Sequence, residues 1–184
     1  MTFKVGYFVG SLSSKSINRE LSKVLIRLAP DDLEFSEIPI RNLPLYSPDY
    51  DASYPPEAVA LKEAIHGSQA ILFVTPEYNR SVPGLLKNAI DVGSRPYGKS
   101  AWEGKPAAVV SVSPGVIGAF GANQALRQSF VFLNMPALQQ PEAYIGGAAK
   151  LFDDKGELIS DSTREFLGKF LQAFAQWIER IAAK

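Results

Sequence analysis

The chain has 184 residues, the size of one ordinary domain, and its 19 Lys and Arg residues balance 19 Asp and Glu residues. Zero formal charge argues against binding to nucleic acid or to an anionic membrane, because either partner usually requires a basic field. The chain has no cysteine and a single histidine, His66. Disulfides, thiolate catalysis and Cys-ligated metals are therefore excluded, and a His-rich metal site cannot be built.

The chain also lacks the apolar segments of a secreted or membrane protein. The apolar run at its start is too short for a signal peptide, and no stretch approaches the ~20 apolar residues that a membrane span needs. We therefore expect a cytoplasmic protein without a membrane partner.

Short apolar runs alternate with amphipathic segments along the whole sequence. Strands are predicted at 4–9, 33–38, 69–75, 106–112 and 143–146, and helices at 18–28, 57–66, 83–92, 123–133 and 162–182. Ser16 is the predicted N-cap of the first helix, and Pro83 suits the first turn of the third. Such alternation predicts an α/β fold in one domain over 1–184. Its five-stranded parallel sheet has the order 2-1-3-4-5, with helices on both faces.

Three features are assigned to structure rather than to chemistry. The aromatic stripe that includes Phe166 and Trp177 has helical spacing and is predicted to pack in the core. His66 is predicted to be a solvated residue at a helix end. The long loop between Leu43 and Pro56, with three tyrosines, fits a lid or a subunit contact better than a domain boundary.

In this strand order ligands bind beyond the carboxyl ends of strands one and three, where the winding direction reverses. The first loop there contains Ser11, Ser13, Lys15, Ser16 and Asn18 and leads directly into a helix. Hydroxyl, amide and free backbone N–H groups at a helix N-terminus favour a phosphate. A serine that only caps the helix is the simpler alternative for any single residue here.

The loops after strands three and four complete the predicted site. In the second, Tyr78 can cover the face of a flat ring while Asn79 and backbone amides bind its polar edge. In the third, Gly115 and Gly118 allow close approach of the backbone, and Ser113 can donate a hydrogen bond. Taken singly, the second is also typical of a turn with a half-buried tyrosine, and the third of a Gly-rich turn.

Together these segments resemble the NAD(P)H-dependent FMN reductases, in particular the branch of bacterial quinone and chromate reductases. The resemblance is carried by Gly10-Ser-Leu, Ser16-x-Asn18, Pro76-Glu-Tyr-Asn79, the stretch from Pro83 to Asp91, and Ser94-Arg-Pro96. It continues through Leu126-Arg-Gln128 and 131–134 to Gln140-Pro-Glu142, so it spans nearly the whole chain.

The resemblance implies a flavodoxin-like three-layer sandwich that binds FMN, takes hydride from NADH or NADPH, and passes it in ping-pong order to quinones, free flavin, chromate or azo compounds. It also implies a homodimer or homotetramer. No side chain is expected to act as a catalytic acid, base or nucleophile, because the cofactor carries the chemistry. The residues implied to bind FMN are Ser11, Leu12, Ser13, Lys15, Ser16, Ile17 and Asn18, then Pro76, Glu77, Tyr78, Asn79 and Arg80, and finally Ser113 and Gly115.

The sequence departs from the family pattern at two of these positions. Ser13 stands where the family usually has arginine, and Lys15 can supply the missing charge; Arg80 also replaces a different residue. A flavodoxin-type electron carrier is the alternative from another class, but such carriers are usually strongly acidic and this chain is neutral. A receiver-type signalling domain would need acidic residues where Gly10 and Ser11 stand, so we reject it.

Overall fold

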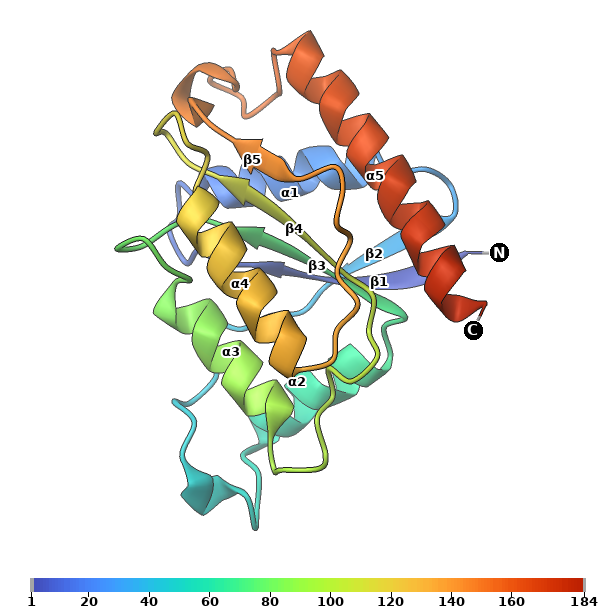
Figure 1. The fold of residues 1–184 in the computed structure, drawn as a ribbon. Coiled ribbons are helices and arrows are strands. Elements are labelled where there is room, and N and C mark those ends of the chain that lie inside the picture. Colours follow the sequence, from blue (N-terminus) through green and yellow to red (C-terminus); the bar gives the residue numbers. More distant parts are fainter. Residues whose placement is uncertain (1, 184) are drawn as a thin grey trace.

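The computed structural model describes residues 2–183, and its centre is a parallel sheet (Figure 1). The strands are hydrogen-bonded in the order β2-β1-β3-β4-β5. Their bounds are β1 (Phe3–Val9), β2 (Leu33–Glu37), β3 (Ala70–Thr75), β4 (Ala107–Val112) and β5 (Ala143–Ile145). Every pair is parallel, with Val9 opposite Val74 and Thr75 opposite Ser111. The predicted flavodoxin-like sheet is confirmed, and the carboxyl ends of β1, β3 and β4 lie at one edge.

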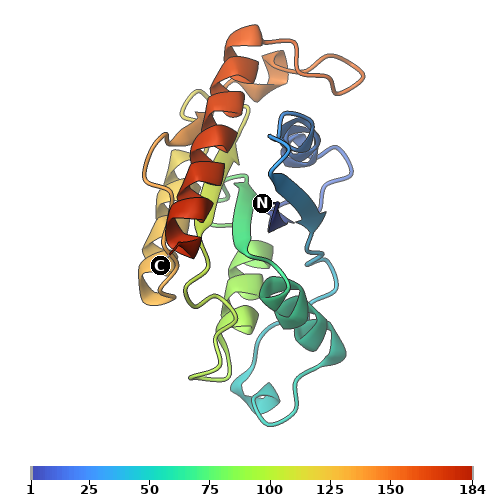
Figure 2. The ribbon, with the colours of Figure 1, turned by 90° about the vertical axis from the view of Figure 1, so that its right-hand side faces the viewer.

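Helices cover both faces of this sheet (Figures 1 and 2). One face packs on α1 (Ile17–Arg27) and α5 (Asp161–Ala182), and the other on α2 (Pro56–His66), α3 (Gly84–Ser94) and α4 (Phe120–Phe132). Strand β3 shows how the core is divided, since Leu72 and Val74 pack toward α1 and α5 while Ile71 and Phe73 pack toward α2, α3 and α4. Within residues 2–183, no helix combines the length and apolar character needed to cross a bilayer.

Most predicted elements are confirmed to within two residues, but the predicted start of the fourth helix is wrong. Helix α4 begins at Phe120, not at 123, so Gly121 lies in the helix instead of the loop. Its N-cap Ala119 makes no side-chain cap bond, so the local sequence carries no start signal. Pro83 likewise is the N-cap of α3 and precedes its first turn.

Two of the structural assignments made from the sequence are confirmed, those of the aromatic stripe and of His66. In α5, Phe170 and Phe174 are fully buried, while Phe166 and Trp177 pack against the same core from its edge. His66 is the exposed last residue of α2. These residues therefore support the fold and lie outside the predicted site.

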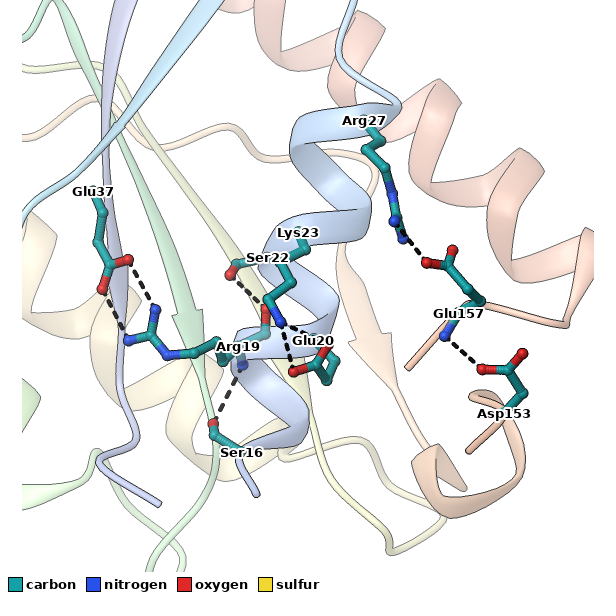
Figure 3. Close-up of polar contacts among 9 residues, drawn as sticks. All are labelled: Ser16, Arg19, Glu20, Ser22, Lys23, Arg27, Glu37, Asp153 and Glu157. Atoms are coloured by element: carbon teal, nitrogen blue, oxygen red, sulfur yellow. Dashed lines mark hydrogen bonds and ion pairs between the residues drawn. The ribbon is translucent and has the colours of Figure 1, made fainter. Parts of the chain in front are cut away.

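The first turn of helix α1, which follows the first loop, is held by two contacts of Arg19 (Figure 3). Ser16 Oγ accepts from the backbone N of Arg19 at 3.2 Å, which confirms the predicted cap. The Arg19 guanidinium donates to both oxygens of Glu37, the last residue of β2, at 2.8 and 2.9 Å. These hydrogen bonds lower the pKa of the Glu37 carboxyl. The pair therefore stabilises the fold above the ordinary pKa of glutamate and loses this effect as the pH falls through the lowered value.

The tyrosine-rich loop before α2 is attached to α3. The side chain of Asn88 accepts from Tyr46 N and donates to Pro44 O, both at 2.9 Å. The Tyr54 hydroxyl donates to Val92 O at 3.3 Å, and burial raises the pKa of Tyr54 to about 12. These bonds hold the loop on the helix that follows the second site loop.

Replacing Gly93 with alanine should destabilise the protein by about 1–3 kcal/mol, because the added methyl group would overpack the core. A Cβ at Gly93 would lie 2.6 Å from Nε1 of the fully buried Trp102, which donates to Ile90 O at 2.9 Å. Gly84→Ala is the matched control on the same helix, since a Cβ there meets nothing within 4 Å. Urea unfolding of both variants checks this, and equal stabilities would contradict the packing argument.

Candidate functional site

Hydrogen bonds fix each of the three loops to a neighbouring element at the carboxyl edge of the sheet. Gly10 N, at the start of the first loop, donates to Val74 O in β3 at 2.8 Å. The Glu77 carboxylate in the second loop accepts from Ala122 N of α4 at 3.1 Å. The third loop is bonded to the segment after β5, since Ser113 O accepts from Ala148 N at 3.1 Å. The structure thus brings together the three segments that the sequence places in one site.

The first loop has a buried inner side and an exposed outer side. Ser11, Ser16 and Asn18 are buried, Ile17 is half-buried, and Leu12, Ser13 and Lys15 are exposed. Two hydroxyls are used inside the loop, because Ser11 Oγ accepts from Ser13 N at 3.4 Å and Ser13 Oγ from Lys15 N at 3.2 Å. The charged Lys15 therefore lies on the exposed side of this loop.

Asn18 is the residue of this loop whose polar group lacks a partner. It is 5 % exposed, and its Oδ1 makes no hydrogen bond within residues 2–183. A buried amide oxygen without a partner is uncommon and calls for an explanation, of which a bound group is one. Because the two ends of an amide are nearly indistinguishable, Asn18 can present either Nδ2 or Oδ1 at this position. With Nδ2 so placed, the first turn of α1 offers several donors and fits a phosphate.

The second loop is a tight turn with an unusual backbone. Tyr78 and Ser81 exchange backbone hydrogen bonds of 3.1 and 3.0 Å, and the two residues between them, Asn79 and Arg80, have φ of 50° and 64°. Two consecutive left-handed residues are typical of a type I′ turn, where glycine is favoured at the second. The conformation costs an arginine about 1–2 kcal/mol. Pro76 is half-buried, and Tyr78 is 54 % exposed beside this turn.

Glu77 holds this turn against α4. Its side chain is 11 % exposed; Oε2 accepts from Ala122 N, and Oε1 accepts from Arg80 Nη1 at 3.1 Å. Gly121 permits the contact, because a Cβ there would lie 2.9 Å from both Arg80 O and Glu77 Oε2. The carboxylate therefore caps α4 from a different loop, replacing the cap that Ala119 lacks.

The third loop is supported by a buried polar network. Ser113 is half-buried and donates through Oγ to the carbonyl of the exposed Gly115 at 3.3 Å. Beneath it, Ser111 Oγ donates to Gly118 O at 2.7 Å and accepts from Asn123 Nδ2 at 3.1 Å. Ser111 and Asn123 are fully buried, so they set the position of the loop without facing solvent.

Two contributors to this edge lie outside the loops predicted from the sequence. Arg41, after β2, donates from Nη2 to Leu12 O at 3.2 Å and brings a second cation to the first loop. The segment after β5 also reaches that loop, because Ala148 and Ala149 line a groove of about 510 Å³ together with Lys15 and Ile17. The pair Gly146-Gly147 at the end of a predicted strand is a sequence signal for the segment after β5. Nothing in the sequence indicates the role of Arg41.

Comparison with known proteins identifies the family. Residues 3–150 match the family described as NADPH-dependent FMN reductase. The chain belongs to this family. It is 60 % identical to a quinone reductase of Pseudomonas putida, covering 96 % of this chain and 95 % of the relative. It is 43 % identical to a 2-hydroxy-1,4-benzoquinone reductase of a Burkholderia species, covering 97 % of both.

A solved structure agrees with these sequence relatives. The flavoenzyme FerB, an NAD(P)H:acceptor oxidoreductase of Paracoccus denitrificans, superposes with a TM-score of 0.91 at 44 % identity, covering 97 % of this chain and 98 % of FerB. This member of the FMN reductase family is therefore an NAD(P)H-dependent oxidoreductase with FMN as its cofactor. The alternative of a simple electron carrier is not supported.

The cost of the left-handed turn can be measured directly. We expect Arg80→Gly to be more stable than Arg80→Ala by about 1 kcal/mol, because both remove the ion pair with Glu77 but only glycine accepts φ of 64° without strain. Urea or thermal unfolding of the two variants checks this. Equal stability of the alanine and glycine variants would show that the turn relaxes without cost.

Proposed function

We propose that this FMN-dependent oxidoreductase reduces quinones, and that a single domain carries the whole site, because all three site loops follow strands of one sheet. Two relatives that cover nearly the whole chain are a quinone reductase and a 2-hydroxy-1,4-benzoquinone reductase. The cytoplasmic location expected from the sequence remains part of the proposal. The observation that carries the site assignment is the buried side-chain oxygen of Asn18 at the start of α1, which has no hydrogen-bond partner within residues 2–183.

The first loop would hold the phosphate of FMN. The helix N-terminus offers N–H groups and a positive dipole end, Ser11 and Ser16 lie beside Asn18, and Lys15 adds a charge from the solvent side. Arg41 supports the loop through Leu12 O and supplies the positive charge that Ser13 does not. A dianion suits this combination of neutral donors and two nearby cations.

The second and third loops would hold the ring. Tyr78 presents an exposed aromatic surface, Pro76, Asn79 and Arg80 border it, and Ser113 and Gly115 contribute from the other side of β3. When bound, FMN supplies the two-electron chemistry between NAD(P)H and the acceptor. The protein contributes rigid positions and N–H dipoles that stabilise negative charge, and it requires no nucleophile or general base.

Binding of the cofactor tests the site, and its redox response tests the function. After reconstitution with FMN, the desalted protein should stay yellow, bleach anaerobically with NADH or NADPH, and regain its colour with a quinone. Asn18→Leu should weaken FMN binding roughly tenfold or more, because a hydrogen bond to a charged group is lost. Ser22→Ala, also buried on α1 but bonded to Arg19 O, is the matched control.

A colourless wild-type protein without affinity for FMN would contradict the proposed function. Unchanged FMN affinity in Asn18→Leu would contradict only the position of the phosphate.

We also propose that the protein is a homodimer that uses the exposed end of α4. Val131 and Phe132 at this end are 84 % and 76 % exposed, and Tyr97, 83 % exposed, lies with Phe132 in a groove of about 510 Å³. Apolar side chains gathered in this way favour a protein contact. A second copy of the chain is the expected partner, as the family resemblance implies.

Sedimentation equilibrium should show a dimer that Phe132→Ser converts toward monomer. Ile159→Ser, another exposed apolar residue in a loop before α5, should leave the mass unchanged. A wild-type monomer at micromolar concentration would contradict this assembly.

A further inference from the structure

Arg80 is a cation whose backbone is fixed and whose side chain is free. The turn hydrogen bonds between Tyr78 and Ser81 and the close contact of Arg80 O with Gly121 set its backbone. Its side chain is nevertheless 77 % exposed. Within residues 2–183, one oxygen of Glu77 is the hydrogen-bond acceptor of its guanidinium. Most of its N–H groups therefore remain available to another acceptor.

The negative charge of Glu77 does not fully compensate Arg80. The same carboxylate accepts from Ala122 N at the beginning of α4, where the helix dipole provides roughly half a positive charge. Counting Arg80, Glu77 and the helix end together, the surroundings of the turn are net positive. This net positive charge lies at the turn that also carries Tyr78, where a substrate of the proposed function would bind.

The backbone conformation argues that the side chain itself matters. Glycine would occupy the second left-handed position of this turn without strain, and α4 already gives Glu77 a partner. An arginine that served only to pair with Glu77 would thus keep a strained backbone for an ion pair whose arginine end is exposed to solvent, where screening reduces its effect on stability. The strained backbone is better explained if Arg80 is present because its positive charge acts at the site.

We propose that Arg80 is a specificity-determining residue that binds an anionic group of the substrate lying against Tyr78. This inference rests on the proposed function. The anion is either a phosphate of the nicotinamide dinucleotide or an acidic substituent of the quinone, and both suit the forked guanidinium. Arg80 acts by attracting and orienting this group, and it takes no part in hydride transfer.

The test uses the FMN-loaded enzyme and its Arg80→Gln and Arg80→Lys variants. Glutamine keeps the Cβ and the turn strain but removes the charge, and lysine keeps the charge. Calorimetric titration with NAD⁺ and NADP⁺, which are not consumed, measures binding to the oxidised enzyme. Steady-state kinetics with a neutral benzoquinone and a sulfonated naphthoquinone measures the acceptor. Arg27→Gln is the matched control, because Arg27 is 51 % exposed with one ion pair near the far end of α1.

We expect Arg80→Gln to weaken binding of its anionic partner about fivefold, with lysine restoring most of the loss and added salt reducing the difference. A loss confined to the dinucleotides assigns the anion to the donor, and a raised KM confined to the sulfonated quinone assigns it to the acceptor. The proposal would be overturned if Arg80→Gln left both the affinity for the dinucleotides and the KM for the sulfonated quinone unchanged. It would also be overturned if the variant changed the KM of neutral and charged quinones equally. If the wild-type enzyme retains FMN and turns over quinone, an unaffected Arg80→Gln variant contradicts only the role of Arg80 and leaves the proposed function intact.

Discussion

The Glu77 carboxylate is the contact on which the arrangement of the site depends. It lies in the loop after β3, yet it caps α4, which follows β4. A cap supplied from another loop couples two segments far apart in sequence, because moving the second loop would leave the first N–H groups of α4 without an acceptor. The same carboxylate directs Arg80. The position of the turn beside Tyr78 and the start of α4 are therefore set by one side chain.

Order at this edge also comes from beneath the loops. Ser111 and Asn123 are fully buried and hydrogen-bonded to each other, to Gly118 O and to Ala143 O. On the other side of the sheet edge, Arg19 and Glu37 join α1 to β2. Loops held by such networks present their polar groups in fixed positions, so a ligand does not have to order them. Asn18, whose amide lacks a partner, is the exception within this part of the chain.

The Arg80 turn combines backbone strain with an exposed charge. Strained residues that persist beside a ligand site point to a role for the side chain. The chain as a whole has zero formal charge. Attraction of an anion to Arg80 would therefore come from the local positive charge of this residue, because the chain carries no net positive charge. A family built around one cofactor can vary its substrates through such a residue without altering the sheet or the phosphate loop.

The sequence by itself determined the alternation of strands and helices and the three candidate loops, because apolar periodicity and polar clusters are local properties of the chain. The strand order was predicted from the fold type that this alternation suits, and the hydrogen bonding between strands confirms it. Residues such as Ser16 and the buried face of α5 followed from the same local rules. Only the tertiary structure decided where α4 begins, that Arg41 reaches the first loop, and that Glu77 supplies a cap. These features depend on side chains from separate loops that come into contact only in the folded protein. Neither residue spacing nor helix propensity predicts which distant N–H group a carboxylate will accept a hydrogen bond from.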